Sequence, residues 1–409
     1  MTLSGDFKFK EMQKRLLVLA AGILQIPVIK RAREMGFYVI AADGDAYACG
    51  LQYADKAIVA DITSEEEMLA IAREEKINGV IHPCSEVSMN VMGRINDELG
   101  LSGITREQAI RATNKHLMRE AFENGNAPSP KSILTKSAED AWTQFLELEG
   151  DGILKPSRNS GSRGIAKVEK DTETKDSFIK KYDEALSTSR DKSVLLEQFI
   201  KGPEFSIEII VWNGQINILT VTDKKTTGAP HFVELGHNQP SCFPAAQVEE
   251  LKAAAIAGVK ALGVNNCACH AEAKLQNGKA YLMEIGARLG GDFISTVLTR
   301  LSTGIDMVAA AIDCALNIEP DLMPKSSPQG VCIRYFCPEP GKLLNISNLN
   351  LLKQPWVYDS EIYCKVGLEI PEITSSLSRS GHVIVTAQTP EEAISLAEDL
   401  IDKVEFETN

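Results

Sequence analysis

Two glutamates stand in the apolar strands on either side of an Asn-Gly turn near residue 277. A two-residue turn would leave Glu272 facing Met283, whereas a three-residue turn would place Glu272 directly opposite Glu284 on the same face. Opposed carboxylates repel each other, and a divalent cation between them reverses the repulsion. Mg²⁺ commonly takes one or two carboxylates together with phosphate oxygens. The alternative is a pair of solvated glutamates, which the apolar character of both strands disfavours.

A lysine followed by a loop of small residues could hold phosphate groups. Lys155 ends a short apolar run, and "PSRNSGSRG" follows it at 156–164. Backbone N–H groups freed by glycine could contact phosphate oxygens, while Lys155 and Arg163 supply positive charge. The alternative is an ordinary hairpin punctuated by Gly161 and Gly164, with Lys155 reaching water at the end of a strand. This window alone favours the ordinary hairpin.

Arg288 lies just beyond the two glutamates, in "GARLGGD" at 286–292. The glycines let the backbone approach a ligand closely, and a guanidinium there could hold a charged oxygen through two hydrogen bonds. The alternative is an ordinary surface arginine.

The elements that must position these residues begin with alternating strands and helices. Strands are expected at 14–22, 37–43, 56–61 and 79–86, and helices at 24–36 and 64–75. This alternation predicts a doubly wound parallel sheet in a domain over residues 1–112. Its first turn, "AAGILQ", has one glycine, so the dinucleotide-binding fingerprint is absent, and the chain also has no G-x-x-x-x-G-K-[ST] phosphate loop.

From about residue 130 the pattern changes to shorter strands and antiparallel hairpins. We expect a helical stretch at 105–128, a strand at 193–200, hairpins at 205–221 and 267–285, a helix at 248–263, and a final strand followed by a helix. The change predicts an α/β (α+β) fold with a central domain at 113–325 and a C-terminal α+β segment at 326–409.

Composition limits the classes of partner. The 409 residues carry a formal net charge of −13, which disfavours a broad nucleic-acid or anionic-membrane surface. No apolar run approaches the ~20 residues of a bilayer span, and the polar start lacks the apolar core of a signal peptide. Nine cysteines, including those of "CACH" at 267–270, show neither a disulfide framework nor paired zinc spacing. They predict reduced thiols in the cytoplasm.

Five segments, in this order, resemble the ATP-grasp superfamily of carboxylate–amine ligases: "NKHLMRE", "ILKPSRNSGSRGI", "LLEQFIKGPEFSIE", "HAEAKL" and "MEIGARLGGD". The resemblance covers essentially the whole chain. It implies an ATP-grasp fold with an N-terminal doubly wound domain and a lid subdomain at about 130–200. It also implies ATP and Mg²⁺ as cofactors, with Mn²⁺ as an alternative metal.

The resemblance implies a role for each matching residue. The implied ATP-binding residues are Lys115, Lys155, Ser160, Gly161, Ser162, Arg163, Gly164, Glu197, Phe199, Ile200 and Glu204. Within this set the two lysines hold the α- and β-phosphates, and the loop at 160–164 covers the terminal phosphates. Glu197 accepts from the adenine amino group, Phe199 and Ile200 contact the base, and Glu204 binds the ribose.

The resemblance also implies the metal ligands and the catalytic arginine. Glu272 and Glu284 are the implied metal ligands, and Arg288 is implied to stabilise the acyl-phosphate and tetrahedral states. The chain departs from the common pattern at Gly286, where many members have an asparagine. The departure leaves a third side-chain metal ligand in doubt.

Within the superfamily, the chain looks most like the bacterial L-amino-acid (dipeptide) ligases. His237 is then implied to steady the substrate carboxylate or the oxyanion, and Glu86 to read the amino group of the first substrate. The alternatives are a turn histidine and a carboxylate at the start of a helix. The implied reaction activates a small carboxylate as an acyl phosphate and joins it to an amine, with release of ADP and phosphate. Small molecules are the expected partners, and a homodimer is plausible by analogy with the family.

Two other functions remain open. One is a different ATP-grasp ligase, of the purine-pathway or carboxylase type. The other is a non-catalytic regulatory protein that binds ATP.

Overall fold

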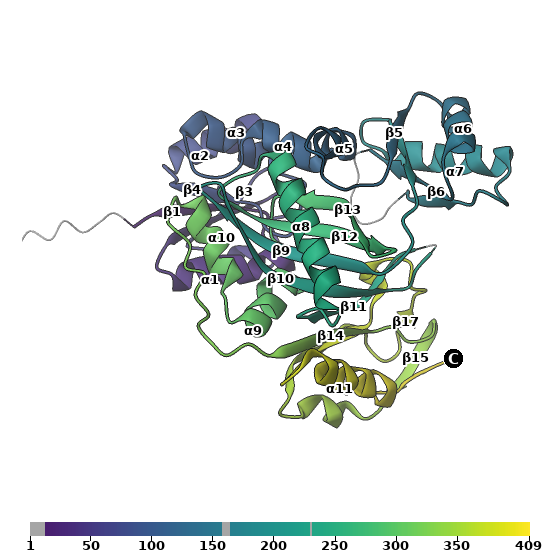
Figure 1. The fold of residues 1–409 in the computed structure, drawn as a ribbon. Coiled ribbons are helices and arrows are strands. Elements are labelled where there is room, and N and C mark those ends of the chain that lie inside the picture. The colour runs from purple at the N-terminus through teal and green to yellow at the C-terminus, as the bar shows by residue number, and fades with distance from the viewer. Residues whose placement is uncertain (1–12, 158–163, 230) are drawn as a thin grey trace, which may run out of the picture.

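The computed structural model describes residues 13–157, 164–229 and 231–409 (Figure 1). The first sheet is parallel, in the order β3-β2-β1-β4. Its strands are β1 (Arg15–Leu19), β2 (Tyr38–Asp43), β3 (Lys56–Val59) and β4 (Gly79–Ile81). Helix α1 (Ile26–Glu34) packs on one face, and α2 (Glu65–Glu74) and α3 (Met89–Leu99) pack on the other. The expected parallel sheet is therefore present.

The helical stretch expected at 105–128 is divided into two helices. These are α4 (Arg106–Thr113) and α5 (Lys115–Asn124). Asn114 between them is extended, and its side chain accepts a hydrogen bond from the backbone N–H of Leu117. An asparagine in this position ends one helix and caps the next, which places Lys115 in the first turn of α5.

A second, four-stranded sheet has the order β5-β8-β6-β7. It consists of β5 (Ser132–Thr135), β6 (Gly152–Pro156), β7 (Ala166–Val168) and β8 (Val194–Gln198), covered by α6 (Ala138–Glu147) and α7 (Lys175–Thr188). It has its own core, in which Phe145 stacks on Phe178 with ring centroids 5.3 Å apart. In Figure 1 this unit projects to the upper right.

The central sheet has eight antiparallel strands in the order β13-β12-β9-β10-β11-β14-β18-β16. They are β9 (Glu204–Trp212), β10 (Gln215–Thr226), β11 (Glu234–Gln239), β12 (Cys267–Gln276), β13 (Lys279–Gly286), β14 (Gly330–Phe336), β16 (Val357–Ile362) and β18 (Gly381–Ala387). Helix α8 (Ala245–Leu262) lies across one face (Figure 1). Three of these strands follow residue 326, so the sheet crosses the domain boundary expected there.

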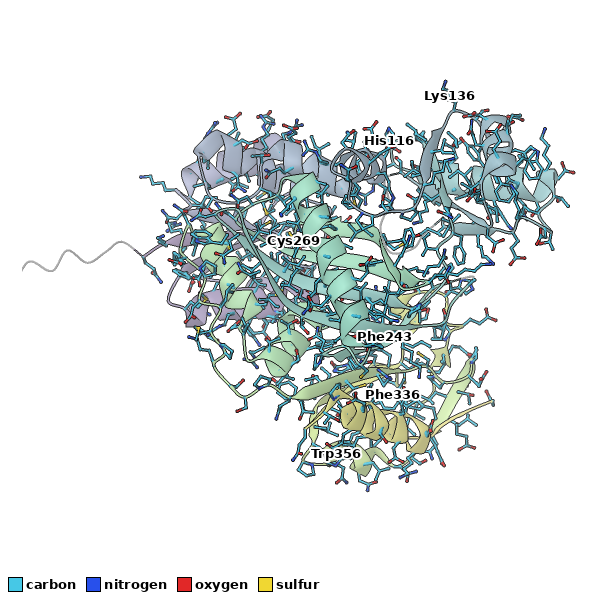
Figure 2. The ribbon with its side chains drawn as sticks, viewed as in Figure 1. His116, Lys136, Phe243, Cys269, Phe336 and Trp356 are labelled. Carbon is cyan, nitrogen blue, oxygen red and sulfur yellow. The ribbon has the colours of Figure 1, made fainter. Side chains whose placement is uncertain are left out.

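Short helices connect the central sheet to its neighbours. They are the π-helical turn η3 (Ile294–Leu298), α9 (Thr299–Thr303) and α10 (Met307–Ala315). Single 3₁₀ turns are η1 (Ile23–Gln25), η2 (Leu51–Tyr53), η4 (Leu349–Lys353) and η5 (Ser376–Ser378). Phe243, labelled in Figure 2, packs edge-to-face on Phe205 of the central sheet, with centroids 4.7 Å apart.

The C-terminal segment adds a further layer. Helix α11 (Pro390–Lys403) covers β14 and β18, as the sequence predicted for the last strand and helix. A small sheet, β17-β15-β19, is formed by β15 (Gly341–Ile346), β17 (Glu369–Ile370) and β19 (Phe406–Thr408). Phe336 and Trp356, both labelled in Figure 2, belong to the apolar cluster beneath α11.

All nine cysteines are unpaired, and those of β12 are buried as expected. Among the described residues, no helix combines the length and the apolar character needed to span a bilayer.

Candidate active site

The hairpin of β12 and β13, here called the carboxylate hairpin, carries Glu272 and Glu284. Its register differs from both of the registers considered from the sequence. The turn is the two-residue Asn277-Gly278 turn, with positive φ at both residues, and Gln276 lies opposite Lys279. Between Ala273 and Glu272 the register shifts by one residue at a β-bulge. Glu272 therefore faces Glu284, although the turn is the shorter one. Met283 is the extra residue that the bulge accommodates.

Both carboxylates line a cavity of about 600 Å³ between the four-stranded sheet, the N-terminal domain and the central sheet. The expected site residues at its wall are Glu86, Lys115, Lys155, Gly164, Phe199, Ile200, Glu204, Glu272, Glu284 and Arg288. Ser160, Gly161, Ser162 and Arg163 fall outside the described residues. Glu197 and His237 are buried behind the wall.

Each of the opposed carboxylates is bound to an ammonium group. Lys224 Nζ lies 3.1 Å from Glu272 Oε1, and Lys115 Nζ lies 2.7 Å from Glu284 Oε2. Lys224 is the main reason that the pKa of Glu272 lies well below its usual value. Burial acts to raise the pKa of Glu284, but Lys115 outweighs it and keeps the pKa below normal. Two ionised carboxylates on neighbouring strands are oxygen donors that fit Mg²⁺.

Lys155 sits in a buried cluster of charges. Its Nζ lies 2.7 Å from Glu197 Oε2, and Arg119 Nε donates to Glu197 Oε1 at 2.8 Å. Burial would raise the pKa of Glu197, but the two cations lower it to about 2. Burial, followed by the nearby Arg119 and Lys115, lowers the pKa of Lys155. Phosphate oxygens at the cavity wall would therefore stabilise the charged form of Lys155.

The cavity also has an aromatic wall, which can accommodate a planar nucleotide base. Phe199 has the ammonium groups of Lys167 and Lys274 at 5.1 Å and 5.3 Å from its ring centroid. Phe232 lies 6.5 Å from Phe199, centroid to centroid. Glu204 forms an ion pair with Lys274 at 2.9 Å and lies at the edge of this wall. Aromatic faces offer a planar ring both dispersion and stacking contacts.

Arg288 lies across the backbone of Gly286. A Cβ at Gly286 would come within 3.1 Å of Arg288 Nε, so glycine leaves room for the guanidinium. Arg288 Nη2 donates to Glu86 Oε1 at 3.1 Å, while the buried Nε has no partner among the described residues. Burial and the nearby Glu284 raise the pKa of Glu86. The guanidinium therefore has an unused donor next to the two carboxylates of the hairpin.

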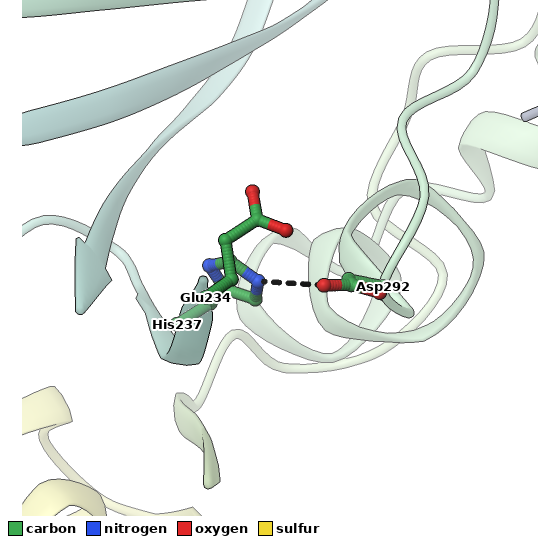
Figure 3. A group of neighbouring side chains, drawn as sticks. All are labelled: Glu234, His237 and Asp292. Atoms are coloured by element: carbon green, nitrogen blue, oxygen red, sulfur yellow. Dashed lines mark ion pairs between the residues drawn. The ribbon is translucent and has the colours of Figure 1, made fainter. Parts of the chain in front are cut away.

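His237 lies further along the central sheet, next to Asp292 (Figure 3). Its Nε2 is 3.6 Å from Asp292 Oδ2. Asp292 in turn accepts two hydrogen bonds from Arg379, at 2.7 and 2.8 Å. Arg379 comes from the loop before β18, and thus from the C-terminal segment.

Sequence reasoning missed several of these charged partners. Arg119 carries a weak signal, because it lies four residues after Lys115 and thus on the same face of α5. Asp292 closes the "GARLGGD" segment and could have been singled out. Lys224 and Arg379 have no signal near them in the chain, because their partners come from distant strands and loops.

Comparisons with known proteins agree with this architecture. Residues 149–297 match the ATP-grasp domain, and residues 334–409 match the L-amino acid ligase C-terminal domain 2. An alanine–anticapsin ligase of Bacillus subtilis (strain 168) is 28% identical over 249 residues, which are 56% of this chain and 52% of that protein. The chain thus spans about half the length of this curated relative.

Two solved structures share the fold over almost the whole chain. An L-amino acid ligase from Bacillus licheniformis has a TM-score of 0.82 at 19% identity, covering 97% of this chain and 99% of that one. A phosphoribosylglycinamide synthetase from Anaerococcus prevotii has a TM-score of 0.77 at 22% identity, covering 97% and 100%. At these identities the likeness establishes the fold. The two domain matches show that the chain contains an ATP-grasp domain at 149–297 and an L-amino acid ligase C-terminal domain at 334–409.

Proposed function

We propose that this protein is an ADP-forming ligase that activates an L-amino acid at its carboxylate and couples it to an amine. The supporting observation is the single cavity that brings Glu272 and Glu284, directly opposed, together with Lys115, Lys155 and Arg288. Acyl-phosphate chemistry needs these groups: oxygen ligands for a metal, cations for phosphates, and a donor for developing negative charge.

The phosphates of ATP would be bound by the carboxylate hairpin together with Lys115 and Lys155. Mg²⁺ held by Glu272 and Glu284 would neutralise charge on the phosphate oxygens. With Glu284 serving as a metal ligand, Lys115, which now pairs with it at 2.7 Å, would be free to contact the phosphates. Lys155 lines the cavity from β6, and its Nζ lies 2.7 Å from Glu197 Oε2 in the absence of phosphate.

The adenosine part of ATP would contact Phe199, Ile200 and Glu204, which line the cavity. Glu197 accepts from the adenine amino group only if it exchanges a partner, because Arg119 and Lys155 now bind both of its oxygens. We propose that phosphates drawing Lys155 away permit this exchange. The loop at 160–164 would then cover the terminal phosphates.

The amino acid whose carboxylate is activated would be bound by Arg288 and Glu86. A substrate amino group can replace Arg288 as the partner of Glu86, which frees the guanidinium for the substrate carboxylate and the oxyanion. The carboxylate oxygen attacks the γ-phosphorus and ADP leaves. The amine then forms the C–N bond, and phosphate departs with the electrons of the C–O bond. Enclosure between the sheets would protect the acyl phosphate from water.

An amino acid as the carboxylate is supported by the L-amino acid ligase C-terminal domain at 334–409. A second candidate is a purine-pathway ligase, which the likeness to the phosphoribosylglycinamide synthetase supports at the level of the fold.

The test uses hydroxylamine as a small nucleophile that traps acyl phosphates. The full-length protein is incubated with ATP, Mg²⁺, hydroxylamine and each of the common amino acids in turn, and ADP and hydroxamate are measured. We expect equal amounts of ADP and hydroxamate with a subset of amino acids, and neither product from the Glu284→Gln variant. Release of AMP and pyrophosphate, or turnover only with a purine-pathway substrate, would contradict the proposal.

A further inference from the structure

Three side chains from two distant parts of the chain converge beside the cavity. Glu234 and His237 come from β11, and Asp292 comes from the loop after β13 (Figure 3). One ligand atom of each residue lies within 4.8 Å of the other two. Glu234 is part of the cavity wall, so the group borders the site proposed for catalysis.

His237 is the unusual member of this group. Its side chain is fully buried, and among the described residues neither ring nitrogen has a hydrogen-bond partner. A buried polar atom without a partner costs free energy, and native structures contain few of them. The ring is aimed at Asp292, with 3.6 Å between Nε2 and Oδ2. This points to a ligand that completes the hydrogen bonding here.

Both carboxylates are partly engaged and can still accept. Arg379 donates to the two oxygens of Asp292, and Lys224 Nζ lies 2.8 Å from Glu234 Oε1. A carboxylate has about four lone-pair positions, so each retains acceptor capacity after these contacts. The free acceptors and the imidazole surround a site suited to N–H donors.

The net charge of the ion-paired residues around this group favours some classes of ligand over others. Lys224 also binds Glu272, so Lys224 and Arg379 together pair with three carboxylates, Glu234, Glu272 and Asp292. The ion pair of His270 with Glu208, which adjoins Glu272, adds no net charge to this group. One negative charge is left over. A monocation neutralises it, whereas a divalent metal overcompensates, and Mg²⁺ prefers ligands that are all oxygen. A substrate carboxylate or oxyanion would be repelled, which argues against that role for His237.

We propose that Glu234, His237 and Asp292 bind the amino group of the second, attacking substrate, an L-α-amino acid. This inference rests on the proposed ligase function and deepens it. An ammonium nitrogen about 2.9 Å from each acceptor can serve three atoms spaced up to 4.8 Å apart. Only the ammonium of Lys224 separates Glu234 from Glu272, which places the subsite next to the activated carboxylate.

The carboxylates hold the amine, and His237 takes its proton. Glu234 and Asp292 accept two N–H groups, and rotation of the partly exposed Glu234 side chain opens the way to the imidazole behind it. One proton passes from the ammonium to a ring nitrogen of His237. The freed lone pair forms the C–N bond while the C–O bond to phosphate breaks, with its electrons leaving on phosphate. The second proton of the nitrogen goes to the departing phosphate.

The experiment compares two nucleophiles on the same acyl phosphate. Hydroxylamine is weakly basic and largely uncharged at neutral pH, so it needs neither the carboxylates nor the base. We expect Glu234→Gln and Asp292→Asn to raise KM for the amino-acid nucleophile about 10- to 100-fold, as for a lost hydrogen bond to a charged group. We expect His237→Asn to lower kcat with that nucleophile. The ratio of amide to hydroxamate formed should fall in all three variants, and the hydroxamate that they still form also shows that they are folded. Exposed Glu319 provides the matched control, Glu319→Gln.

The outcomes separate the two proposals. If wild-type protein forms no hydroxamate with any amino acid, the ligase function fails, and the subsite fails with it. If hydroxamate forms but no amino acid acts as nucleophile, or if the variants affect both nucleophiles equally, the subsite alone is overturned. Calorimetric titration with Zn²⁺ or Mn²⁺ in the absence of nucleotide provides a further check. A bound ion that is lost in His237→Asn would identify a metal site instead.

Discussion

At the scale of single residues, the charged groups of the cavity wall are paired with one another. Lys115 is bound to Glu284, and Arg288 to Glu86. A buried charge without a partner is costly, so these pairs keep the charges in place in the absence of substrate. Each pair also holds a group that the proposed reaction requires. Binding of substrates would therefore proceed by exchange of partners.

Gly286 provides a test of how Arg288 is held. A methyl group at this position would meet the guanidinium at 3.1 Å, so the guanidinium would have to shift by a few tenths of an ångström. We expect Gly286→Ala to lower ADP release about tenfold. The change in unfolding free energy should stay below about 1 kcal/mol, because the clash involves the end of a flexible side chain. Steady-state kinetics and urea denaturation measure the two effects.

Gly291 is the matched control for this substitution. A Cβ there would meet nothing within 4 Å, and no positive φ requires glycine. Gly291→Ala should therefore leave activity near wild type. Equal losses in both alanine variants would show that backbone flexibility, rather than the room for Arg288, matters in this loop.

At the scale of elements, the start of α5 positions Lys115. A lysine in the first turn of a helix is unfavourable with respect to the helix dipole. The Asn114 cap and the contact with Glu284 offset this cost. The break between α4 and α5 is thus part of the site.

Removing this cap should affect both stability and nucleotide binding. We expect Asn114→Ala to lower the unfolding free energy by about 1 kcal/mol, as for other N-caps, and to raise KM for ATP several-fold because Lys115 loses its fixed position. Ser137 caps α6 through the same kind of hydrogen bond, away from the cavity. Ser137→Ala should cost similar stability with no change in KM. An unchanged KM in Asn114→Ala would contradict the role assigned to the cap.

Helix α10 carries a carboxyl group whose titration should be visible in stability. Burial, and then the nearby Asp306, raise the pKa of Asp313 from 3.8 to about 6. Because the folded state keeps this proton more tightly, stability falls as the pH rises from about 4 through 6. The ionised carboxylate then remains a cost at neutral pH.

Asp313→Asn removes that cost. Asp313 is only partly buried, so solvent screening limits the gain to about 1 kcal/mol at pH 8. We expect the gain to shrink as the pH falls below 6 and to vanish below about 4. Urea denaturation across this range checks the prediction, and a gain independent of pH would refute it.

At the scale of the whole molecule, the site lies where separate sheets meet. The four-stranded sheet supplies Lys155, the central sheet supplies the two hairpin carboxylates, and the N-terminal domain supplies Glu86. The C-terminal segment adds Arg379 through its contact with Asp292. A ligand that touches all of these units should stabilise them together.

Nucleotide with metal should therefore raise the melting temperature. A ligand at 100 times its Kd stabilises the folded state by about 2.7 kcal/mol. We expect ATP with Mg²⁺ to produce such a shift, and removal of Mg²⁺ by a chelator to abolish most of it. In Glu272→Gln the increment due to Mg²⁺ should be lost, while Glu319→Gln should keep it. Calorimetric or fluorescence melting curves measure this, and a full increment in Glu272→Gln would rule out that carboxylate as a metal ligand.

The sequence by itself determined the local features. The Asn-Gly turn, the apolar strands around the two glutamates, the strand that carries Lys155, and the α8 helix ending at Gly263 were all predicted and are present. Turn preference and hydrophobic periodicity depend on neighbours in the chain, so they can be read from the sequence. The order of the five segments pointed to the ATP-grasp fold in the same way.

Only the tertiary structure decided which groups meet. The bulge at Met283, and not a longer turn, brings Glu272 opposite Glu284. The contacts of Lys224 with Glu272 and of Arg379 with Asp292 join strands and loops far apart in the chain. Strand register and the packing of distant segments set these pairs, and no local pattern encodes either. The chemistry of single residues was therefore visible in the sequence, whereas their partners were not.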